Sequence, residues 1–446
     1  MLTRACLSLA LLMGVPAWCQ VYTNGADADT TNDTRMLTPP PVSGQAYPAA
    51  PAGEQRSNYL RYGLSFSSAY SDNAFGGTNP QSDVSYSIAP TIALDETTST
   101  LHSVLSYSPG FTFYQRGSSF NAADQNLAIA IQDRLSPHVT LSVQDGLQKS
   151  SSVFNQPEFG SAGTVSGGTE GSGLSVIPPI SDLLTNSAYV GVSYQFAANG
   201  MVGASGTFTN LHYPNSAEVP GLSDSSSQGG SLFHSLRISR MHYVGVSYQY
   251  QRMVSSPTEG RSETQTHTVF FFYTLYPASG ISISFFGGPQ YSDTLQPPIL
   301  GLQLPSSRAW TPAAGASFSW QGRLTGLAMS YQHVISGGGG LAEAVHVNSG
   351  NVSIRQQIAR SVSASVSGVY AQNDMVGAAL FGGDNNGHTL SGTVSLSKQF
   401  GEHLSFQFGY TRLHQDYGTV PVLASTPDTN REFVSVSYQF SRPLGR

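Results

Sequence analysis

The chain has 446 residues, a formal net charge of −6 and 10% charged residues, against about 25% in an average soluble domain. A surface so poor in charge argues against an ordinary soluble domain, and the mild, dispersed negative charge argues against a nucleic-acid partner. No apolar run outside the N-terminus approaches the roughly 20 residues that a membrane helix requires, so a bilayer-spanning form of this chain needs strands closed on themselves.

The N-terminal residues carry the features of an export signal. Arg4 supplies a positive charge, residues 5–15 form an apolar core, and a small-x-small run at residues 17–19 provides a cleavage site. We therefore expect residues 1–19 to be a signal peptide, whose removal takes both cysteines with it. Residues 20–57 are polar and rich in Pro, Ala, Gly and Thr. We expect them to form a disordered periplasmic segment, with a short plug entering a barrel lumen as the alternative.

The rest of the chain, residues 58–446, repeats an alternation of apolar and polar residues. In the first such segment Tyr62, Leu64 and Phe66 share one face, because successive side chains of a strand point to opposite sides. The other face carries Ser, Thr, Gln, Asn and Gly, where a soluble sandwich would carry Lys and Glu. One face suits lipid and the other suits water. The pattern therefore predicts an all-β fold, a closed antiparallel transmembrane β-barrel.

Alternating segments of about ten residues, separated by turn signals, continue to the C-terminus as in outer-membrane barrels. We count about eighteen, an even number as bacterial barrels require, with about sixteen as the alternative. The expected strands lie near residues 60–66, 84–92, 101–107, 127–131, 139–143, 186–196, 201–213, 230–239, 242–253, 265–276, 280–291, 309–320, 323–335, 346–358, 361–373, 388–400, 403–415 and 431–441.

The connections alternate in length, which predicts the orientation of the barrel. Periplasmic turns of such barrels are short and extracellular loops are long, so both termini of the barrel are expected on the periplasmic side. The short connections are 197–200, 239–241, 277–280, 321–323, 359–361 and 401–403, and the long ones are 148–184, 214–229, 292–308, 374–387 and 416–430.

Four arginines fall on the face opposite to the apolar one and are predicted to line the lumen. A charge that faced lipid at mid-membrane would cost about 2–4 kcal/mol, which favours the inward placement. One hypothesis is that they form a ladder that selects anionic solutes. The alternative is that they pair with acidic residues and only hydrate the lumen. The four are Arg61, Arg134, Arg237 and Arg355.

Aromatic residues gather toward the segment ends, and this placement predicts girdles at the two membrane boundaries. Ordinary strand propensity is the alternative explanation. The residues concerned are Tyr59, Tyr70, Tyr114, Phe196, Tyr213, Tyr276, Tyr291, Trp310, Trp320, Phe400 and Phe440.

Fragments that resemble catalytic or metal-binding motifs lack the structural context that such chemistry needs. A Ser-x-x-Lys run at residues 395–398 lies in an alternating strand, not on a helix, and the histidines lack close-spaced partners. The glycines at residues 337–340 precede no helix that would bind phosphate. We expect no cofactor, no metal and no enzyme activity, and a lipid-modifying enzyme assembled across strands stays an alternative.

Aliphatic residues stand beside proline in four of the long connections. Such stiff apolar runs are unfavourable when extended in water. We hypothesise that they fold inward or pack together over the barrel mouth as a constriction, and the alternative is packing within each loop. The runs are 176–180, 219–222, 297–300 and 420–423.

Residues 63–66, 70–75, 82–84 and 88–90 together resemble the opening strands of the β-barrel porin 2 family. Tyr70, Asp72 and Asn73 match the end of the family's first strand, although Ser71 replaces an aspartate that is common there. The resemblance implies an outer-membrane barrel, often encoded beside exopolysaccharide genes, and implies no catalytic residues.

The C-terminal alternation resembles the signal that the barrel assembly machinery recognises. Tyr438 and Phe440 occupy the expected positions, and a tail of residues 441–446 follows the usual terminal aromatic.

We therefore expect a passive channel in the bacterial outer membrane for polar solutes or for export of an exopolysaccharide. The alternatives are a non-conducting structural or surface-interaction barrel and the lipid-modifying enzyme. The expected partners are outer-membrane lipid, the assembly machinery and a polar solute or polysaccharide.

Overall fold

The computed structural model describes residue 36 and residues 58–76, 80–152, 154, 181–214, 222–257, 260–295, 306–341, 343–376, 386–417 and 428–444. They belong to one compact unit, Thr34–Arg446. Apart from Met36, the expected signal peptide and the segment 20–57 lie outside the described residues and stay predictions.

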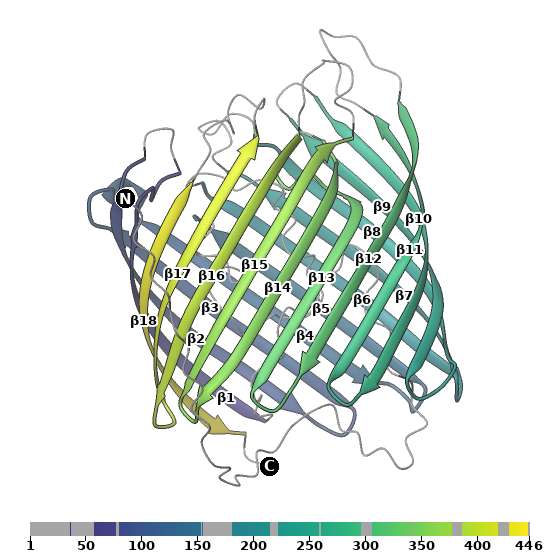
Figure 1. The fold of residues 1–446 in the computed structure, drawn as a ribbon, viewed down its shortest axis with the longest axis horizontal. Helices are drawn as coiled ribbons and strands as arrows, with labels where there is room; N and C mark the ends of the chain where they lie inside the picture. Colours follow the sequence, from purple (N-terminus) through teal and green to yellow (C-terminus); the bar gives the residue numbers. More distant parts are fainter. Residues whose placement is uncertain are drawn as a thin grey trace, which may run out of the picture. The chain divides into compact units, whose positions relative to one another are not determined.

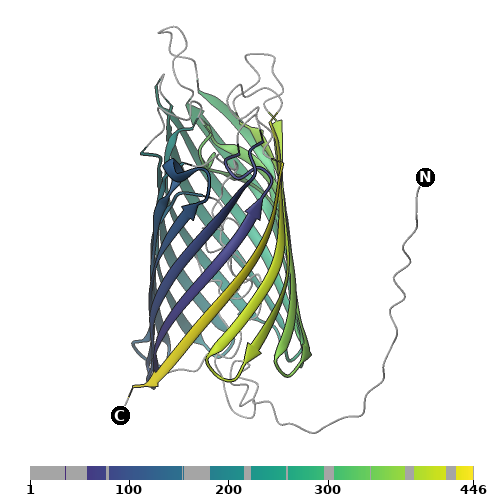
Figure 2. The ribbon, with the colours of Figure 1, turned by 90° about the vertical axis from the view of Figure 1, so that its left-hand side faces the viewer.

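The described residues form one closed antiparallel sheet of 18 strands, in which each strand pairs with its neighbours in the chain and β1 pairs with β18 (Figures 1 and 2). The predicted fold class, strand number and order are therefore confirmed. The strands are β1 (Tyr59–Ser71), β2 (Asp83–Thr97), β3 (Leu101–Tyr114), β4 (Ala122–Arg134), β5 (Val139–Ser150), β6 (Leu183–Ala197), β7 (Gly200–His212), β8 (Asp224–Arg237), β9 (His242–Ser256), β10 (Ser262–Ala278), β11 (Ile281–Leu295), β12 (Ser307–Gln321), β13 (Thr325–Ser336), β14 (Val345–Ala359), β15 (Val362–Met375), β16 (Asn386–Phe400), β17 (Leu404–Tyr417) and β18 (Thr429–Pro443).

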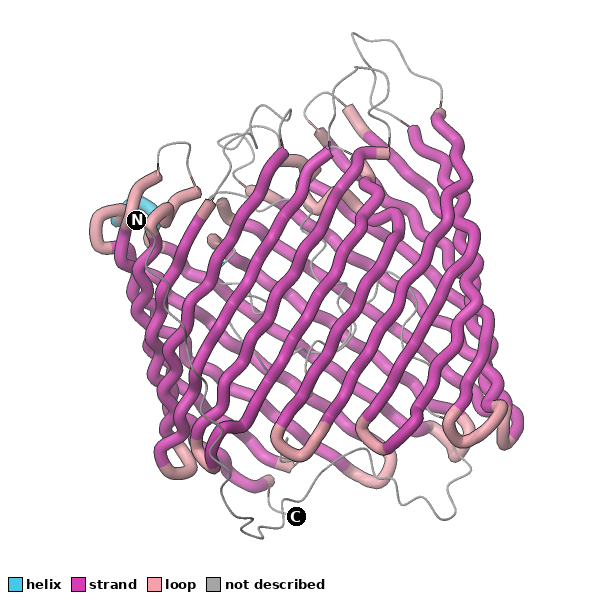
Figure 3. The backbone as a smooth tube through the Cα atoms, viewed as in Figure 1, coloured by secondary structure: helices cyan, strands magenta, loops and turns pink. Residues whose placement is uncertain are grey.

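Strands account for nearly all regular structure among the described residues (Figure 3). Between β3 and β4 lies a single turn of 3₁₀ helix, η1 (Ser118–Phe120). In the described ranges we find no helix long and apolar enough to span a bilayer.

The outer face of the barrel is apolar over its middle and periplasmic parts. Leu64 and Phe66 of β1 are exposed there, and Val394 and Leu396 of β16 repeat the pattern on another part of the wall. These side chains stay solvent-accessible in the isolated chain because the barrel has no second layer to cover them. A continuous apolar band of this kind is the surface that lipid covers in outer-membrane barrels.

Several strands continue further toward the extracellular side than the alternation predicted. β8 begins at Asp224 and β10 at Ser262, where the expected ranges began at residues 230 and 265. These extensions are polar on both faces, since water meets both sides of the wall beyond the lipid. Ion pairs mark the same level outside, with Arg252 Nε 2.7 Å from Glu263 Oε1.

The predicted aromatic girdles need one correction. Trp310, Phe196 and Phe440 do face outward and are exposed. Three other members of the predicted set, Tyr114, Tyr213 and Tyr276, belong to the lumen side. Tyr213 is buried in a cluster and Tyr276 packs against the inward-facing Tyr243. Position near a strand end identified the aromatic residues but not the face on which each one lies.

On the lumen side, five aromatic rings lie flat over a glycine of the neighbouring strand. In each case the aromatic residue and the glycine are direct cross-strand partners. A Cβ added at any of the five glycines would fall 2.0–2.3 Å from a ring atom. The rings therefore occupy the room of the missing side chains and lie against the wall. The pairs are Phe233/Gly203, Phe272/Gly245, Phe286/Gly315, Phe433/Gly409 and Tyr417/Gly387.

Candidate functional site

The lumen wall is lined by hydroxyl groups that bond to one another across strands. Because inward positions alternate along each strand, facing Ser and Thr residues meet on the lumen side. The Oγ atoms of Ser205 and Ser231 are 2.7 Å apart, as are those of Ser365 and Ser395. Further pairs are Ser363/Ser397, Ser282/Ser319, Thr393/Thr411, Thr264/Thr294 and Ser87/Thr112. The wall thus offers many neutral donors and acceptors.

The four predicted lumen arginines all lie near the periplasmic ends of their strands. Arg134 and Arg237 are the last residues of β4 and β8, and Arg61 is the third residue of β1. Arg355 is partnered with Gly326, the second residue of β13. The four are therefore grouped at one level of the barrel instead of being spread as a ladder along its axis. Their role in ion selection stays a prediction.

Two of these arginines have partners that the sequence did not predict. Arg61 Nη2 lies 3.4 Å from Asp95 Oδ2, and His102 Nε2 lies 3.5 Å from the other oxygen of Asp95. Arg237 donates from Nη2 to the carbonyl of Ala198, at 2.7 Å, in the β6–β7 turn. Arg61 and Arg237 thus also brace the periplasmic rim.

Met36 lies inside the barrel at its periplasmic end. Its backbone N–H donates to Oε1 of the inward-facing Gln195 at 3.2 Å. Its side chain is buried with Met201 and Tyr243, and the inward-facing Phe233 also packs there. Met36 is the one described residue of the N-terminal segment, and whether the segment forms a plug stays a prediction.

At the extracellular end, an apolar cluster that we call the mouth cluster joins distant parts of the wall. It includes Leu183 and Leu211 of β6 and β7, and Val345 and Tyr417 of β14 and β17. These strands are far apart around the barrel, so the contact crosses the lumen. Residues of two connections fill the space between them, and Leu222 and Leu341 are both buried in the cluster.

The two connections in the mouth cluster are tied together by hydrogen bonds. The Tyr213 hydroxyl donates to the carbonyl of Gly339 at 3.2 Å, and the Ser223 N–H donates to the carbonyl of Gly340 at 2.8 Å. Ser255 of β9 donates to the carbonyl of Leu341 at 2.9 Å. Burial raises the pKa of the Tyr213 phenol, so the hydroxyl stays a donor at neutral pH.

Positive φ angles at two glycines make the turn of the β13–β14 connection. Gly339 and Gly340 have φ of 55° and 117°. A Cβ at Gly340 would lie 2.8 Å from the Tyr213 hydroxyl oxygen. We expected no phosphate site at the glycine run of residues 337–340. These glycines instead allow the β13–β14 connection to turn into the lumen. The fold agrees with the predicted constriction at Leu222, while the other three proline-rich runs lie outside the described residues.

The predicted family-like motif lies where the first and last strands close the barrel. Asp72 accepts the backbone N–H of Asn430 at 2.8 Å and its side-chain amide at 2.6 Å. The carbonyl of Asn73 accepts the hydroxyl of Thr429 at 3.2 Å. Tyr70 faces outward and is exposed. Asp72 and Asn73 thus fasten the extracellular end of the β1–β18 seam.

The same seam carries the predicted assembly residues. Tyr438 and Phe440 face outward opposite Leu64 and Tyr62 of β1. The strand does not end at Phe440, because β18 continues through Ser441 to Pro443 in register with β1. Recognition by the assembly machinery stays a prediction.

Arg431 is a half-buried lumen-side residue that the sequence analysis missed. Its guanidinium lies 4.5 Å from the ring centroid of Phe154, and its Nε has no hydrogen-bond partner. Tyr114 and Ser85 line the same small cavity. The alternation would have revealed Arg431, since odd-numbered residues of its strand face inward. It packs Phe154 of the β5–β6 connection against the seam.

One seam of the barrel is split over its extracellular half. The ladder between β12 and β13 runs only from Ala314↔His333 to Gln321↔Gly326 and is the shortest of the barrel. Above it, residues 307–313 pair with β11 alone and residues 334–336 pair with β14 alone. In Figure 1 the upper end of β13 bends away from β12.

The bent end of β13 lies inside the lumen. Ile335, which the alternation would place outside, is buried against Met253 on the inner face of β9. Its N–H donates to Oε1 of the inward-facing Gln290 at 3.2 Å, in place of a partner on β12. Val334 packs on the inward-facing rings of Phe270 and Phe286.

Residues of the Ser-x-x-Lys run, for which we expected no catalytic role, belong to the barrel wall. Ser395 pairs with Ser365 in the lumen, while Lys398 lies on the outer face with Nζ 4.8 Å from the centroid of the Phe400 ring. The two residues therefore lie on opposite sides of the wall. In the part of the chain that the structure describes, no group of three or more His, Cys, Asp or Glu residues could hold a metal ion.

A closed sheet of 18 antiparallel strands with an apolar outer band and a polar lumen defines the class of bacterial outer-membrane β-barrels. No family model matches the chain, and no curated protein matches it. The resemblance to the β-barrel porin 2 family therefore stays a prediction.

Solved barrel structures cover most of the chain at low similarity. OccK2 (OpdF) of Pseudomonas aeruginosa has 10% identity and a TM-score of 0.41, over 86% of this chain and 98% of its own. OccAB4 of Acinetobacter baumannii has 9% identity and a TM-score of 0.40, over 87% and 99%. The FrpB iron transporter of Neisseria meningitidis has 8% identity and a TM-score of 0.40, over 86% and 83%. At these values the matches carry no functional argument.

Proposed function

We propose that the protein is a passive outer-membrane channel for uncharged polar solutes, with saccharides as the substrate class. The observation that carries the proposal is the lumen wall of paired hydroxyls, Ser365/Ser395 and Ser205/Ser231 among them. Hydroxyls exchange hydrogen bonds with a sugar at little net free energy, so a solute can bind and leave repeatedly. Barrels of this size enclose an aqueous channel.

The flat aromatic rings support the same substrate class. Phe433 lies against Gly409 of the neighbouring strand on the lumen side, where it offers an apolar surface beside the hydroxyls. The apolar face of a sugar ring can pack on such a surface while its hydroxyls bond to Ser and Thr.

Export of an exopolysaccharide is the finer form of the proposal. The continuous polar wall suits a long sugar chain, but the mouth cluster would have to open to let it leave. Tyr213 and Leu341 hold that cluster closed across the lumen, so polymer passage requires a rearrangement that small solutes do not.

The test uses the full-length protein, purified and reconstituted into liposomes. Osmotic swelling in neutral mono- and disaccharides should exceed swelling in charged solutes of equal size. Replacing Arg237 and Arg355 with Gln should lower any anion preference in planar-bilayer conductance, while neutral sugar flux stays unchanged.

Absence of both conductance and swelling would overturn the proposal and favour a structural or surface-interaction barrel. Turnover of outer-membrane lipid by the same preparation would favour the enzyme alternative. The polymer form fails if the Tyr213→Ala variant, with its mouth cluster weakened, still excludes long oligosaccharides.

A further inference from the structure

We propose that the split between β12 and β13 is a lateral portal, through which a single-chain amphiphile such as a free fatty acid passes between the lumen and the outer leaflet. This route is separate from the proposed passage of polar solutes along the barrel axis. It depends on the described edges of β12 and β13 and on the apolar surfaces on either side of them.

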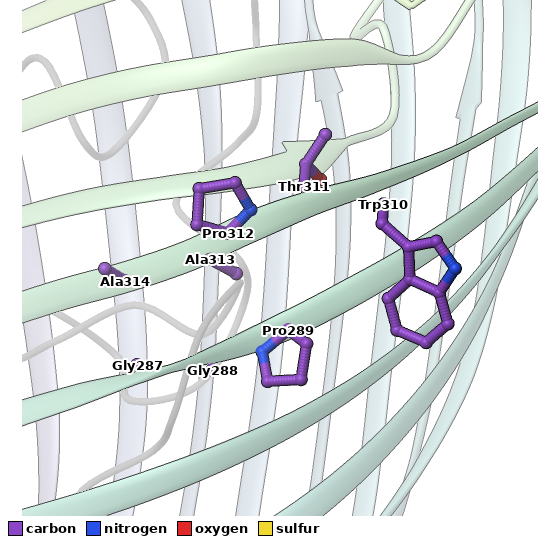
Figure 4. A pocket seen from close by; sticks show the side chains of 8 residues that line it. All are labelled: Gly287, Gly288, Pro289, Trp310, Thr311, Pro312, Ala313 and Ala314. Carbon is purple, nitrogen blue, oxygen red and sulfur yellow. The ribbon is translucent and has the colours of Figure 1, made fainter.

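Beside the split, the outer face of β11 and β12 carries an apolar depression of about 520 Å³ (Figure 4). Gly287, Pro289, Pro312 and Ala314 form its floor and Trp310 stands at its side, with Trp310 70% exposed. Among the described residues that line it, none is charged. Because it opens on the face that lipid covers, the molecule that meets it is an alkyl chain.

The inner side of the split carries a second apolar surface. Phe270, Phe272 and Phe286 form a buried cluster with Val334 and Ala313. Ala313 belongs to both surfaces, since it also lines the outer depression. This inner cluster is closely packed, with Phe270 fully buried, so the route past the edge of β12 from the lipid face to the cluster opens only when the end of β13 moves away from it.

The path has polar groups for a small headgroup. Thr311 lies on the stretch of β12 that pairs with β11 but not with β13, and its hydroxyl is buried without a hydrogen-bond partner. Gln290 is buried beside it as its direct cross-strand partner on β11. A buried polar group without a partner is unfavourable, so a ligand that bonds to Thr311 is stabilised there. A carboxylic acid or alcohol with one alkyl chain fits both requirements.

One proline explains why the wall splits at this point. Pro312 lies on the strand that borders β13, and it has no N–H to give to the β12–β13 ladder. The β12–β13 ladder ends at Ala314, two residues from Pro312. The freed N–H of Ile335 bonds instead to Gln290, so the bent form of β13 leaves no unpaired donor there.

The test is photolabelling of the full-length protein in outer-membrane vesicles with oleic acid that carries a diazirine and an alkyne. Labels are expected on Trp310 and Pro312 outside and on Phe270 and Phe286 inside. A disulfide between Ala313→Cys and Val334→Cys should hold the edge shut. It should reduce the inside labels severalfold, keep the outside labels, and be reversed by reduction.

Matched controls separate the portal from general effects. A Ser365→Cys/Ser395→Cys pair places a disulfide in a complete ladder on the lumen side and should leave the labels unchanged. Gly287→Phe fills the depression, because its Cβ would lie at ordinary contact distances of 3.6–3.8 Å. Gly350→Phe adds the same ring to the outer face of β14 and should have no effect.

Absence of label on Phe270 and Phe286, or inside labels that survive the verified disulfide, would overturn the portal. Label confined to the outer face means ordinary lipid contact and also overturns it. Sugar-driven swelling measured on the Ala313→Cys/Val334→Cys and Gly287→Phe variants tests the polar channel independently, because neither change removes a hydroxyl of the lumen wall.

Discussion

Two seams of this barrel differ in a way that sequence separation does not anticipate. β1 and β18 lie at opposite ends of the chain, yet they pair along their whole length from Tyr59↔Pro443 to Ser71↔Arg431, and Asp72 adds further bonds. β12 and β13 form a local hairpin, yet their ladder stops at Ala314. Closing a long loop has an entropic cost, and extra contacts at the closing seam offset it. The local hairpin has no such need and is free to open.

The difference also shows what holds a strand away from its neighbour. The end of β13 does not lack contacts, because Ile335 packs on Met253 and the following connection is bonded to Tyr213 and Ser255. The split seam is therefore a packed alternative arrangement in which lumen contacts replace ladder hydrogen bonds. Variants that shift this balance sharpen the comparison.

Removing Tyr213 should have the largest effect. Tyr213→Ala deletes a fully buried ring from the mouth cluster and should lower the free energy of unfolding by about 4 kcal/mol, as measured by urea titration in detergent. Single-channel conductance should rise because the inward connections lose their anchor. Tyr213→Phe keeps the ring and loses only the bond to Gly339, so a loss of about 1 kcal/mol is expected. Unchanged conductance in Tyr213→Ala would contradict a constricting role for the cluster.

Weakening the closing seam should have the next largest effect. Asp72→Ala removes both bonds to Asn430 and should lower the free energy of unfolding by about 2 kcal/mol. A double-mutant cycle with Asn430→Ala should show coupling between the two sites. Asp293→Ala breaks an exposed ion pair with Arg308 and should cost less than about 1 kcal/mol. Equal effects of the Asp72 and Asp293 variants would mean that the motif does not fasten the seam.

Removing the bond that stabilises the bent strand should have a smaller effect. Gln290→Ala leaves the Ile335 N–H without its acceptor and should cost about 1.5 kcal/mol. Amide exchange at Ile335 should accelerate, as read by hydrogen–deuterium exchange with mass spectrometry. Exchange at Thr393, inside the complete β15–β16 ladder, should not change and serves as the control.

Restoring a donor at the split should have the smallest effect. Pro312→Val supplies an N–H and should let the β12–β13 ladder lengthen, with a gain of at most about 1 kcal/mol. The same variant should reduce oleate labelling of Phe270 and Phe286. A longer β12–β13 ladder with unchanged labelling would mean that oleate does not enter through this seam, which would contradict the portal.

The sequence was sufficient for the barrel but not for its interior. Residues such as Leu64 and Val394 could be placed because hydrocarbon imposes a period of two on every strand. The orientation of Tyr213 and the bend at Ile335 depend on contacts between residues that are distant in the chain, and no local period encodes them. The sequence did contain one signal of interrupted strand pairing, the prolines Pro289 and Pro312, because proline inside a central strand argues against an unbroken ladder.

The lumen arginines illustrate the same limit. Alternation placed Arg61, Arg134, Arg237 and Arg355 on the inner face, but only the strand register placed them at one level. The partners of these arginines could not be predicted from the sequence, because Asp95 approaches Arg61 from the neighbouring strand and Ala198 approaches Arg237 from a turn.

The five aromatic–glycine pairs influence the width of the lumen. Each of the five glycines lacks a Cβ, and this leaves room for the neighbouring ring to lie against the wall. The glycines are Gly203, Gly245, Gly315, Gly387 and Gly409. An alanine at any one of them would displace the neighbouring ring from the wall. Such one-carbon additions would change the cross-section of the lumen at the height of each pair without adding a charge.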